Sequence, residues 1–279
     1  MGMGRKPYPS DLTDEQWKLI AEFLPPALPG GRPRKTDLRE VVNAMLYLVR
    51  SGCQWRMIPH EFPRWKTVYN YYRAWIDTGV WDEILACLRT DVREQAGRNI
   101  QPRVAAIDSQ SVKTTEQGGE ERGYDGGKKI KGRKRHLVVD SLGLLLAVLV
   151  TSAGIDDGVA AKEVLGMVDS EAFPRLRIVY GDHKYHNHEL YAWTDSNADY
   201  RIEVIDRAEG QRGFQVLPQR WVVERTIAWL SRSRRLSKDC EKLTITSEAM
   251  VKISMIHVML KRLATDSTTH DFGYAKAAA

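Results

Sequence analysis

Apolar residues in the first hundred positions recur every three or four residues, which is the spacing of amphipathic helices. The segment 13–16 has the capping-box sequence Thr-Asp-Glu-Gln, which predicts a helix whose inner face includes Trp17 and Ile20. A second helix is predicted over 37–52, because its apolar residues keep the helical spacing up to a glycine. Another is predicted over 81–93, so we expect the first third of the chain to be all-helical.

The third predicted helix, over 64–76, has two chemically distinct faces. Its inner face is apolar and aromatic, with Val68, Tyr72 and Trp75. Its outer face is polar at the same spacing, with Lys66, Asn70 and Arg73. This pattern suits the recognition helix of a helix-turn-helix domain, whose outer residues reach phosphates and base edges. An ordinary amphipathic surface helix has the same pattern, so both interpretations stay open on this ground alone.

From position 104 the pattern changes to alternating strands and helices. A short apolar strand over 104–107 runs into Asp108, and strands over 136–140 and 144–150 form a predicted hairpin. The remaining elements are predicted as a helix at 157–168, a strand at 177–180, a helix at 186–195, a strand at 200–205 and a helix at 219–236. This order is typical of an α/β mixed sheet covered by helices. The expected organisation is a helical domain at 1–94, a linker at 95–103, an α/β domain at 104–264 and a flexible tail at 265–279.

Composition and charge narrow the class of protein. The 279 residues include 42 Lys and Arg against 36 Asp and Glu, a net charge of +6, and 43% of them are hydrophobic, which excludes a disordered or fibrous chain. The longest apolar run, 142–155, is too short to span a bilayer, and no secretory signal pattern begins the chain. We therefore expect a cytoplasmic protein with no membrane contact. The three cysteines lie far apart and form no metal or disulfide pattern.

The basic residues are clustered. Segment 113–136 holds eight basic and four acidic residues, and segment 220–242 holds seven and three, so each has a net charge of +4. Such patches suit a polyanion, because Lys and Arg displace the counterions condensed on phosphates. A solvated face that keeps the protein soluble is the other interpretation.

Three acids are candidates for catalysis. Asp108 and Asp182 are predicted just past the carboxyl ends of apolar strands, the edge of an α/β sheet at which ligands bind. Glu224 lies among apolar neighbours on the predicted helix 219–236, where an acid is costly unless it is paired or bound to a metal. Three such carboxylates suit Mg²⁺ or Mn²⁺, and two ions together can drive phosphodiester chemistry. Taken singly, each acid could equally cap a turn or face solvent.

Several blocks of the sequence resemble bacterial insertion-sequence transposases of the insertion sequence 4/5 superfamily. In the first third these blocks are the segments 8–17, 31–34 and 52–59. In the remainder they are the segments 107–113, 132–136, 181–185 and 220–226. The resemblance covers nearly the whole chain, from about position 8 to about position 263. It implies an RNase H-like fold preceded by a helix-turn-helix-like domain, and a catalytic, metal-binding Asp-Asp-Glu triad of Asp108, Asp182 and Glu224.

The family signature around the glutamate is matched in part. Arg220 and Glu224 stand at the expected positions, whereas Leu217 and Ser231 replace the Tyr and Lys that help to hold the transposon end in the family. That role is expected to pass to nearby arginines. The basic residues and one asparagine expected to contact DNA are Arg32, Arg34, Lys35, Lys66, Asn70, Arg73, Lys128, Lys129, Lys131, Arg133, Lys134, Arg220, Arg225, Arg232 and Arg235.

The resemblance implies a transposase that binds the terminal inverted repeats of an insertion sequence and cleaves and joins double-stranded DNA in a metal-dependent reaction. The implied cofactor is Mg²⁺, for which Mn²⁺ can substitute. Bringing two transposon ends together implies a homodimer, and the substrate implies a bacterial, nucleoid-associated location. Two alternatives remain: a stand-alone metal-dependent nuclease, and a DNA-binding protein whose core is catalytically inert.

Overall fold

Two of the helices in the first third begin at residues whose side chains cap them, Thr13 and Asp37. The structure, a computed structural model, describes residues 5–27, 30, 33–116, 118–205 and 220–264. Thr13 and Gln16 form the predicted capping box of the first helix, and α2 ends at Gly52 in the left-handed conformation, as expected. The helical elements of this part are α1 (Asp14–Ile20), η1 (Ala21–Phe23), α2 (Leu38–Ser51), η2 (Trp55–Met57), α3 (Trp65–Asp77) and α4 (Val80–Gln95).

A mixed sheet forms the centre of the second part. Its strands are β1 (Val104–Lys113), β2 (Gly123–Asp125), β3 (Ile130–Asp140), β4 (Leu145–Ser152), β5 (Ile178–Gly181) and β6 (Arg201–Val204). β4, β3 and β1 are antiparallel neighbours, and β5 and β6 continue the sheet parallel to β1. The order β4-β3-β1-β5-β6, an antiparallel meander followed by two parallel strands, is RNase H-like, as the sequence predicted.

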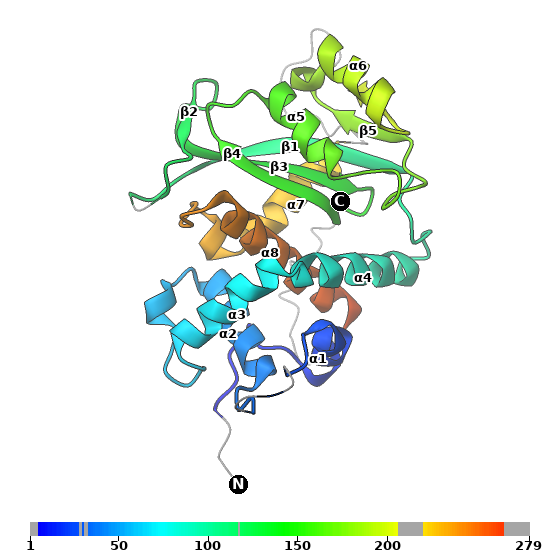
Figure 1. Cartoon of the computed structure of the whole chain (residues 1–279). Helices are drawn as coiled ribbons and strands as arrows, with labels where there is room; N and C mark the ends of the chain where they lie inside the picture. The colour runs from blue at the N-terminus through cyan, green and yellow to red at the C-terminus, as the bar shows by residue number, and fades with distance from the viewer. Residues whose placement is uncertain (1–4, 28–29, 31–32, 117, 206–219, 265–279) are drawn as a thin grey trace, which may run out of the picture.

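Helices cover both faces of this sheet (Figure 1). The helical elements after β1 are α5 (Asp157–Gly166), η3 (His183–Tyr185), α6 (His188–Asn197), α7 (Trp221–Ser231), η4 (Arg234–Leu236) and α8 (Thr244–Leu263). α5 packs on β3 and β4 on one face, whereas α7, α8 and α4 pack on the other. The helix predicted over 219–236 is shorter than expected. The helix α7 stops at Ser231, and the short helix η4 that follows places Arg235 in the interior.

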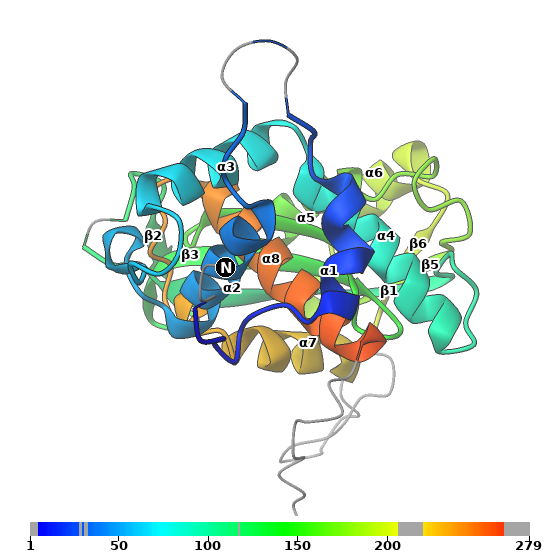
Figure 2. The same ribbon diagram turned by 90° about the horizontal axis from the view of Figure 1, so that it is seen from below.

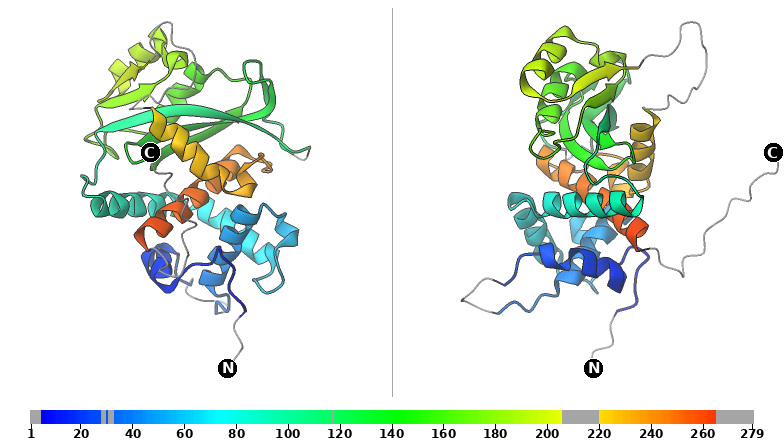
Figure 3. Two further views of the ribbon diagram at one scale, coloured as in Figure 1. Left: turned by 180° about the vertical axis from the view of Figure 1, so that it is seen from behind. Right: turned by 90° about the vertical axis from the view of Figure 1, so that its right-hand side faces the viewer.

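The helix α8 joins the N-terminal helices to the sheet. Figures 1 and 3 show it lying between the N-terminal helices and the sheet, and Figure 2, seen from below, shows it crossing the middle of the molecule. Twelve of its twenty residues are buried, and the eight apolar ones among them belong to one hydrophobic cluster with residues of α1–α4 and with one face of β3 and β4. A second cluster fills the space between the other face of the sheet and α5 and α6. The first cluster thus contains residues from both sides of the linker expected at 95–103. That this linker separates two domains stays a prediction. No helix among the described residues is long and apolar enough to cross a bilayer.

Part of the predicted basic patch is buried. The run 130–135 is the start of β3, and the side chains of Arg133 and Lys134 are almost completely shielded from solvent. Arg133 pairs with Asp239 at 3.2 Å and also donates to backbone carbonyls of Glu121, Glu241 and Lys242. These hydrogen bonds satisfy a guanidinium that would otherwise be costly to bury.

The buried Arg133–Asp239 pair generates a stability prediction. Asp239→Ala leaves the guanidinium without a counter-charge and removes acceptors from Glu241 N and Ser247 Oγ, so we expect the free energy of unfolding to fall by about 3–5 kcal/mol. Urea denaturation measures this change. The control, Arg201→Ala, breaks an exposed pair with Glu203 and should cost less than about 1 kcal/mol. If the two variants lose equal amounts of unfolding free energy, burial does not determine how much the Arg133–Asp239 pair contributes to stability.

Candidate active site

The parallel register of β1 and β5 brings Asp108 and Asp182 together. Ala106 pairs with Tyr180, and each acid lies two residues beyond its member of that pair. Asp182 directly follows β5, as predicted. Asp108 does not follow a strand end, which corrects the prediction: β1 continues to Lys113, because it keeps pairing with β3 after β5 has ended. The acid therefore projects from a continuous strand at the point where its other neighbour stops.

The environment of Asp108 opposes its ionisation. Although the residue as a whole is only partly buried, the loss of hydration around its carboxylate raises the pKa to about 6. The hydrogen bond from Ser109 N, 2.7 Å long, lowers the pKa, whereas the charge of Asp182 raises it. Arg220 and Lys184 add smaller effects that favour the ionised form. Two carboxylates held this close are a site where an added cation is stabilising.

Arg220 links the start of α7 to this pair. Its Nη2 lies 3.8 Å from Asp182 Oδ2, and its Nη1 donates to Ile205 O at 3.3 Å. Arg220 thus contacts one of the catalytic candidates, Asp182, and its predicted contact with DNA stays a prediction. The guanidinium joins the residue before α7 to the segments that follow β5 and β6.

Glu224 lies one helical turn beyond Arg220 and faces solvent. The buried face of α7 consists of Val222, Val223, Thr226 and Leu230, so the expectation of a buried acid on this helix is wrong. Within the described residues Glu224 has no hydrogen-bond or ion-pair partner. Among the described residues, no three His, Cys, Asp or Glu side chains are grouped so that they could hold a metal ion. The structure brings two of the three acids together and leaves the third on the adjoining helix.

A buried acid that the sequence did not single out stands beside the pair. Asp157, the first residue of α5, accepts from Lys184 Nζ at 2.9 Å and lies 3.2 Å from Lys134 Nζ. His136 is close by, and its burial lowers its pKa to about 4. The double acid 156–157 was the available signal, since Asp156 alone supplies the N-cap of α5.

The residues predicted to contact DNA divide into three groups. Those available on the surface are Lys35, Lys66, Asn70, Lys128, Lys129, Lys131 and Arg232, with Arg73 partly exposed. Those engaged inside the protein are Arg133, Lys134 and Arg235, of which Arg235 is bound to Glu241 and Cys53 O. The prediction that these three residues contact DNA is therefore wrong, because their charges are already satisfied in the interior. Arg32 lies outside the described residues, as does Leu217, which stands where the family has a tyrosine.

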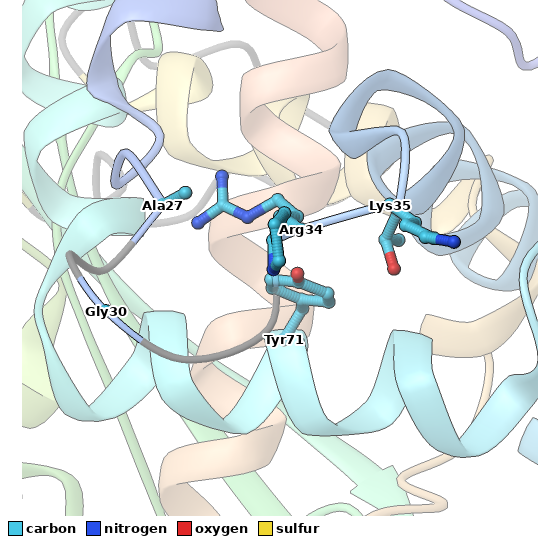
Figure 4. A pocket seen from close by; sticks show the side chains of 7 residues that line it. Ala27, Gly30, Arg34, Lys35 and Tyr71 are labelled. Carbon is cyan, nitrogen blue, oxygen red and sulfur yellow. The ribbon is translucent and has the colours of Figure 1, made fainter.

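Two further arginines have structural contacts at the surface. Arg34 donates to the carbonyls of Pro25 and Pro26, and its guanidinium lies 6.0 Å from the centre of the Tyr71 ring (Figure 4). Arg225 lies over the rings of both Trp221 and Trp229, at 4.1 and 4.6 Å, and donates to Leu142 O. Each can still present one edge to a phosphate, but neither is a free surface cation.

Comparison with known families decides the class to which this arrangement belongs. The profile described as “Transposase DDE domain” matches residues 99–259, which is more than half of the chain. The chain belongs to the DDE transposase family. A second profile, described as “Putative transposase of IS4/5 family”, matches residues 12–85 and so covers the helical part. The resemblance stated from the sequence is confirmed.

Similar proteins match the chain over shorter stretches. This DDE transposase is 39% identical over 77 residues to the uncharacterized protein y4sN of Sinorhizobium fredii, a match covering 28% of the chain and 62% of y4sN. It is 32% identical over 136 residues to the “Putative transposase for insertion sequence element IS402” of Burkholderia cepacia, covering 44% of the chain and 60% of that relative. It thus spans less than two thirds of either relative.

One solved structure has a weaker likeness. The Mos1 transposase paired-end complex with left transposon end is 10% identical, with a TM-score of 0.24 over 64% of this chain and 61% of that one. A similarity this low supports no conclusion. DDE transposases are metal-dependent enzymes. The pair of carboxylates fits a divalent cation, since both offer hard oxygen ligands and the hindered ionisation of Asp108 would be relieved by a positive charge.

The raised pKa of Asp108 gives a prediction for the metal-free protein. The unfolded chain releases this proton near pH 4 and the folded chain near pH 6, so the burial of Asp108 destabilises the fold increasingly as the pH rises from about 4 to 6. In EDTA above pH 6, Asp108→Asn should raise the free energy of unfolding by up to about 3 kcal/mol, at about 1.4 kcal/mol per pKa unit.

Urea denaturation between pH 4 and 8 measures this gain, which should vanish at the acid end. The matched control is Asp199→Asn, an exposed aspartate of the same domain. A gain that does not change with pH, or the same gain in the control, would contradict the account of Asp108.

Proposed function

We propose that this chain binds the terminal inverted repeats of its insertion sequence and catalyses metal-dependent cleavage and strand transfer of double-stranded DNA. The observation that carries the proposal is the Asp108–Asp182 pair, positioned by the register of β1 and β5, with Arg220 and Glu224 on the adjoining helix α7. Membership of the DDE transposase family supports phosphodiester chemistry at this site. The expected substrate, chromosomal and element DNA, places the reaction at the nucleoid in the cytoplasm.

The residues of the site have distinct roles. Asp108 and Asp182 would hold the cation from adjacent strands, and Arg220 keeps Asp182 oriented and α7 in place. We assign Glu224 as the third ligand. Its side chain has no partner among the described residues, so it would lose no interaction if it turned toward the two aspartates. When bound, Mg²⁺, for which Mn²⁺ can substitute, activates water or a 3′-hydroxyl and stabilises charge at the phosphodiester.

The helical layer supplies surfaces for DNA. On α3 the inner residues Val68, Tyr72 and Trp75 are buried, whereas Lys66 and Asn70 are exposed on the other side. We assign this helix to base recognition in the major groove. The tip of the β2–β3 hairpin adds a second basic surface, with Lys128, Lys129 and Lys131. A homodimer, which lets two such chains bring two ends together, is the assembly we propose.

Replacing Glu224 tests the catalytic part of the proposal. On a labelled duplex that carries the end of the element, the wild type should nick at the end and form joined products in Mg²⁺ but not in EDTA. Glu224→Gln should retain end binding and lose both products by at least about a hundredfold, because a metal ligand is removed. The control, Glu171→Gln, makes the same chemical change at an exposed loop residue and should behave as wild type.

Each other result has a definite meaning. Nicking without joined products would identify a stand-alone nuclease. Binding of the end without nicking in either Mg²⁺ or Mn²⁺ would leave a DNA-binding protein with an inert core. Full activity of Glu224→Gln would remove this residue from the site.

The two kinds of contact on α3 can be separated by mutation. Asn70→Ala should reduce discrimination between the correct end and a mismatched duplex by about 1–3 kcal/mol, because amide contacts to base edges carry sequence information. Lys66→Gln should weaken all duplexes alike and lower the salt dependence of binding by about one charge. Fluorescence anisotropy over a range of salt concentrations measures both. Arg175→Gln, an exposed cation of the α/β layer, is the control. Equal loss for matched and mismatched duplexes in Asn70→Ala would contradict base recognition by this helix.

A further inference from the structure

A cationic pocket lies where the ends of α2 and α7 meet the last turns of α8. Its volume is about 270 Å³, and its lining includes Arg50, Arg232, His257, Lys261 and Arg262. Arg50 also donates to Arg232 O at 2.7 Å, so it fixes the end of α7 against α2. Five nitrogen-bearing side chains from three helices thus converge on one cavity. We name this cavity, with these five residues, the α7–α8 pocket.

The positive charge of this pocket is not balanced by the protein. In the described ranges, none of its four Lys and Arg side chains forms an ion pair with a carboxylate. Burial and the charge of Arg50 lower the pKa of Lys261. Asp140, the acid that acts on Arg262, is itself bound to Arg93 in the interior. The fold therefore holds like charges together, a cost that a bound anion would offset.

His257 provides an independent sign of a ligand. Only 8% of the residue is exposed, and its Nε2 is buried without a hydrogen-bond partner in the described part of the chain. Burial, together with Lys261 and Arg50, lowers its pKa to about 3, so the ring is neutral and one ring nitrogen carries a hydrogen. In the tautomer that carries its hydrogen on Nε2, an oxyanion oxygen in the pocket would accept a hydrogen bond from that nitrogen, whereas a metal cation would be repelled by the surrounding charges.

A surface track connects the pocket with the candidate active site. α7 begins beside Asp182 and presents Trp221, Arg225 and Trp229 at successive turns, with Arg225 over both rings and Arg262 4.1 Å from the Trp229 ring. Alternating aromatic and guanidinium groups suit a nucleic-acid strand. The eight steps from Glu224 to Arg232 rise about 12 Å along the helix axis, which equals the rise of three to four base pairs at about 3.4 Å each.

We propose that the α7–α8 pocket binds a backbone phosphate of DNA a few nucleotides from the bond cleaved at the active site. This inference rests on the proposed function for the identity of the substrate. Arg50, His257, Lys261 and Arg262 are new to the DNA interface, whereas Arg232 was expected there from the sequence. The contact is to phosphate, so it holds DNA of any sequence and fixes its position relative to the catalytic acids.

The salt dependence of DNA binding tests the pocket without a cleavage assay. Binding of the full chain to a labelled duplex of mixed sequence, about 30 base pairs long, is measured by anisotropy at increasing salt. Lys261→Gln and Arg232→Gln are each expected to weaken binding about tenfold at low salt and to lower the slope of log affinity against log salt by about one. Arg98→Gln, an exposed cation at the end of α4, is the control and should leave both unchanged.

A direct probe of the pocket is the nuclear magnetic resonance signal of the His257 ring. The duplex should shift this signal in the wild type and in Arg98→Gln, and shift it far less in the Lys261→Gln, Arg232→Gln double variant. If the pocket variants match the control in slope and affinity, the proposal is overturned. It is equally overturned if inorganic phosphate shifts the signal and the duplex does not, since the pocket then serves a free anion.

Metal-dependent cleavage by the wild type, measured in parallel, separates the two claims. Cleavage without any effect of the pocket variants leaves the proposed function standing and removes this inference. A slope change in the pocket variants of a protein that never cleaves supports the phosphate site and removes the catalytic proposal.

Discussion

The burial of α8 is the constraint on which the rest of the structure depends. Twelve of the twenty residues of this helix are buried, and the N-terminal helices on one side and β3 and β4 on the other exclude water from its apolar residues. Polar contacts then fix its position: Tyr72 Oη donates to Thr246 O at 2.5 Å, and Glu248 accepts from Val150 N at 2.9 Å. Because one element completes both cores, the helical layer cannot move far from the sheet without exposing apolar surface.

This packing has a consequence for DNA binding. A recognition helix on a flexible tether would have to be ordered at each binding event, whereas α3 here is held against α8 and α4. The distance between the proposed base-reading face of α3, the α7–α8 pocket and the catalytic acids is therefore built into the fold. Preorganisation of this kind reduces the entropy lost when several contacts form on one duplex.

The basic residues serve two different purposes. Arg133 and Arg235 are buried and paired with Asp239 and Glu241, so they connect β3 and the segment after α7 to the interior. The lysines of the β2–β3 hairpin and the cations of the α7–α8 pocket have no such carboxylates in the described residues. The net charge of a segment cannot distinguish these cases. Only the position of each acid partner in space does so.

The sequence predicted the architecture well because each local signal was strong. The capping box at Thr13, the glycine that ends α2 and the apolar strands each correspond to an observed element. Asp182 was placed correctly from the end of its strand. The position of Asp108 within β1 was not predictable, because the continuation of that strand depends on pairing with β3, which polar residues after Asp108 do not signal.

Other features depend on contacts between distant segments. Arg133 resembled a surface cation in the sequence, since its partner Asp239 lies 106 positions away. The apolar neighbours of Glu224 in the sequence predicted that it is buried, yet the orientation of α7 on the sheet turns it toward solvent. Asp157 was not predictable as part of the site, because its partners Lys134 and Lys184 come from two other elements. Pattern and spacing determine elements, whereas the pairing of charges requires the folded arrangement.

The central claim is that Asp108, Asp182 and Glu224 together hold the catalytic cation. A crystal structure of the transposase with a transposon-end duplex and Mn²⁺ tests it most directly, because the anomalous signal locates the ion without assumptions. The account predicts the signal between Asp108 and Asp182, with oxygens of all three carboxylates about 2 Å from an ion. An ion bound elsewhere, or Glu224 still turned to solvent with the ion and the duplex in place, would contradict it.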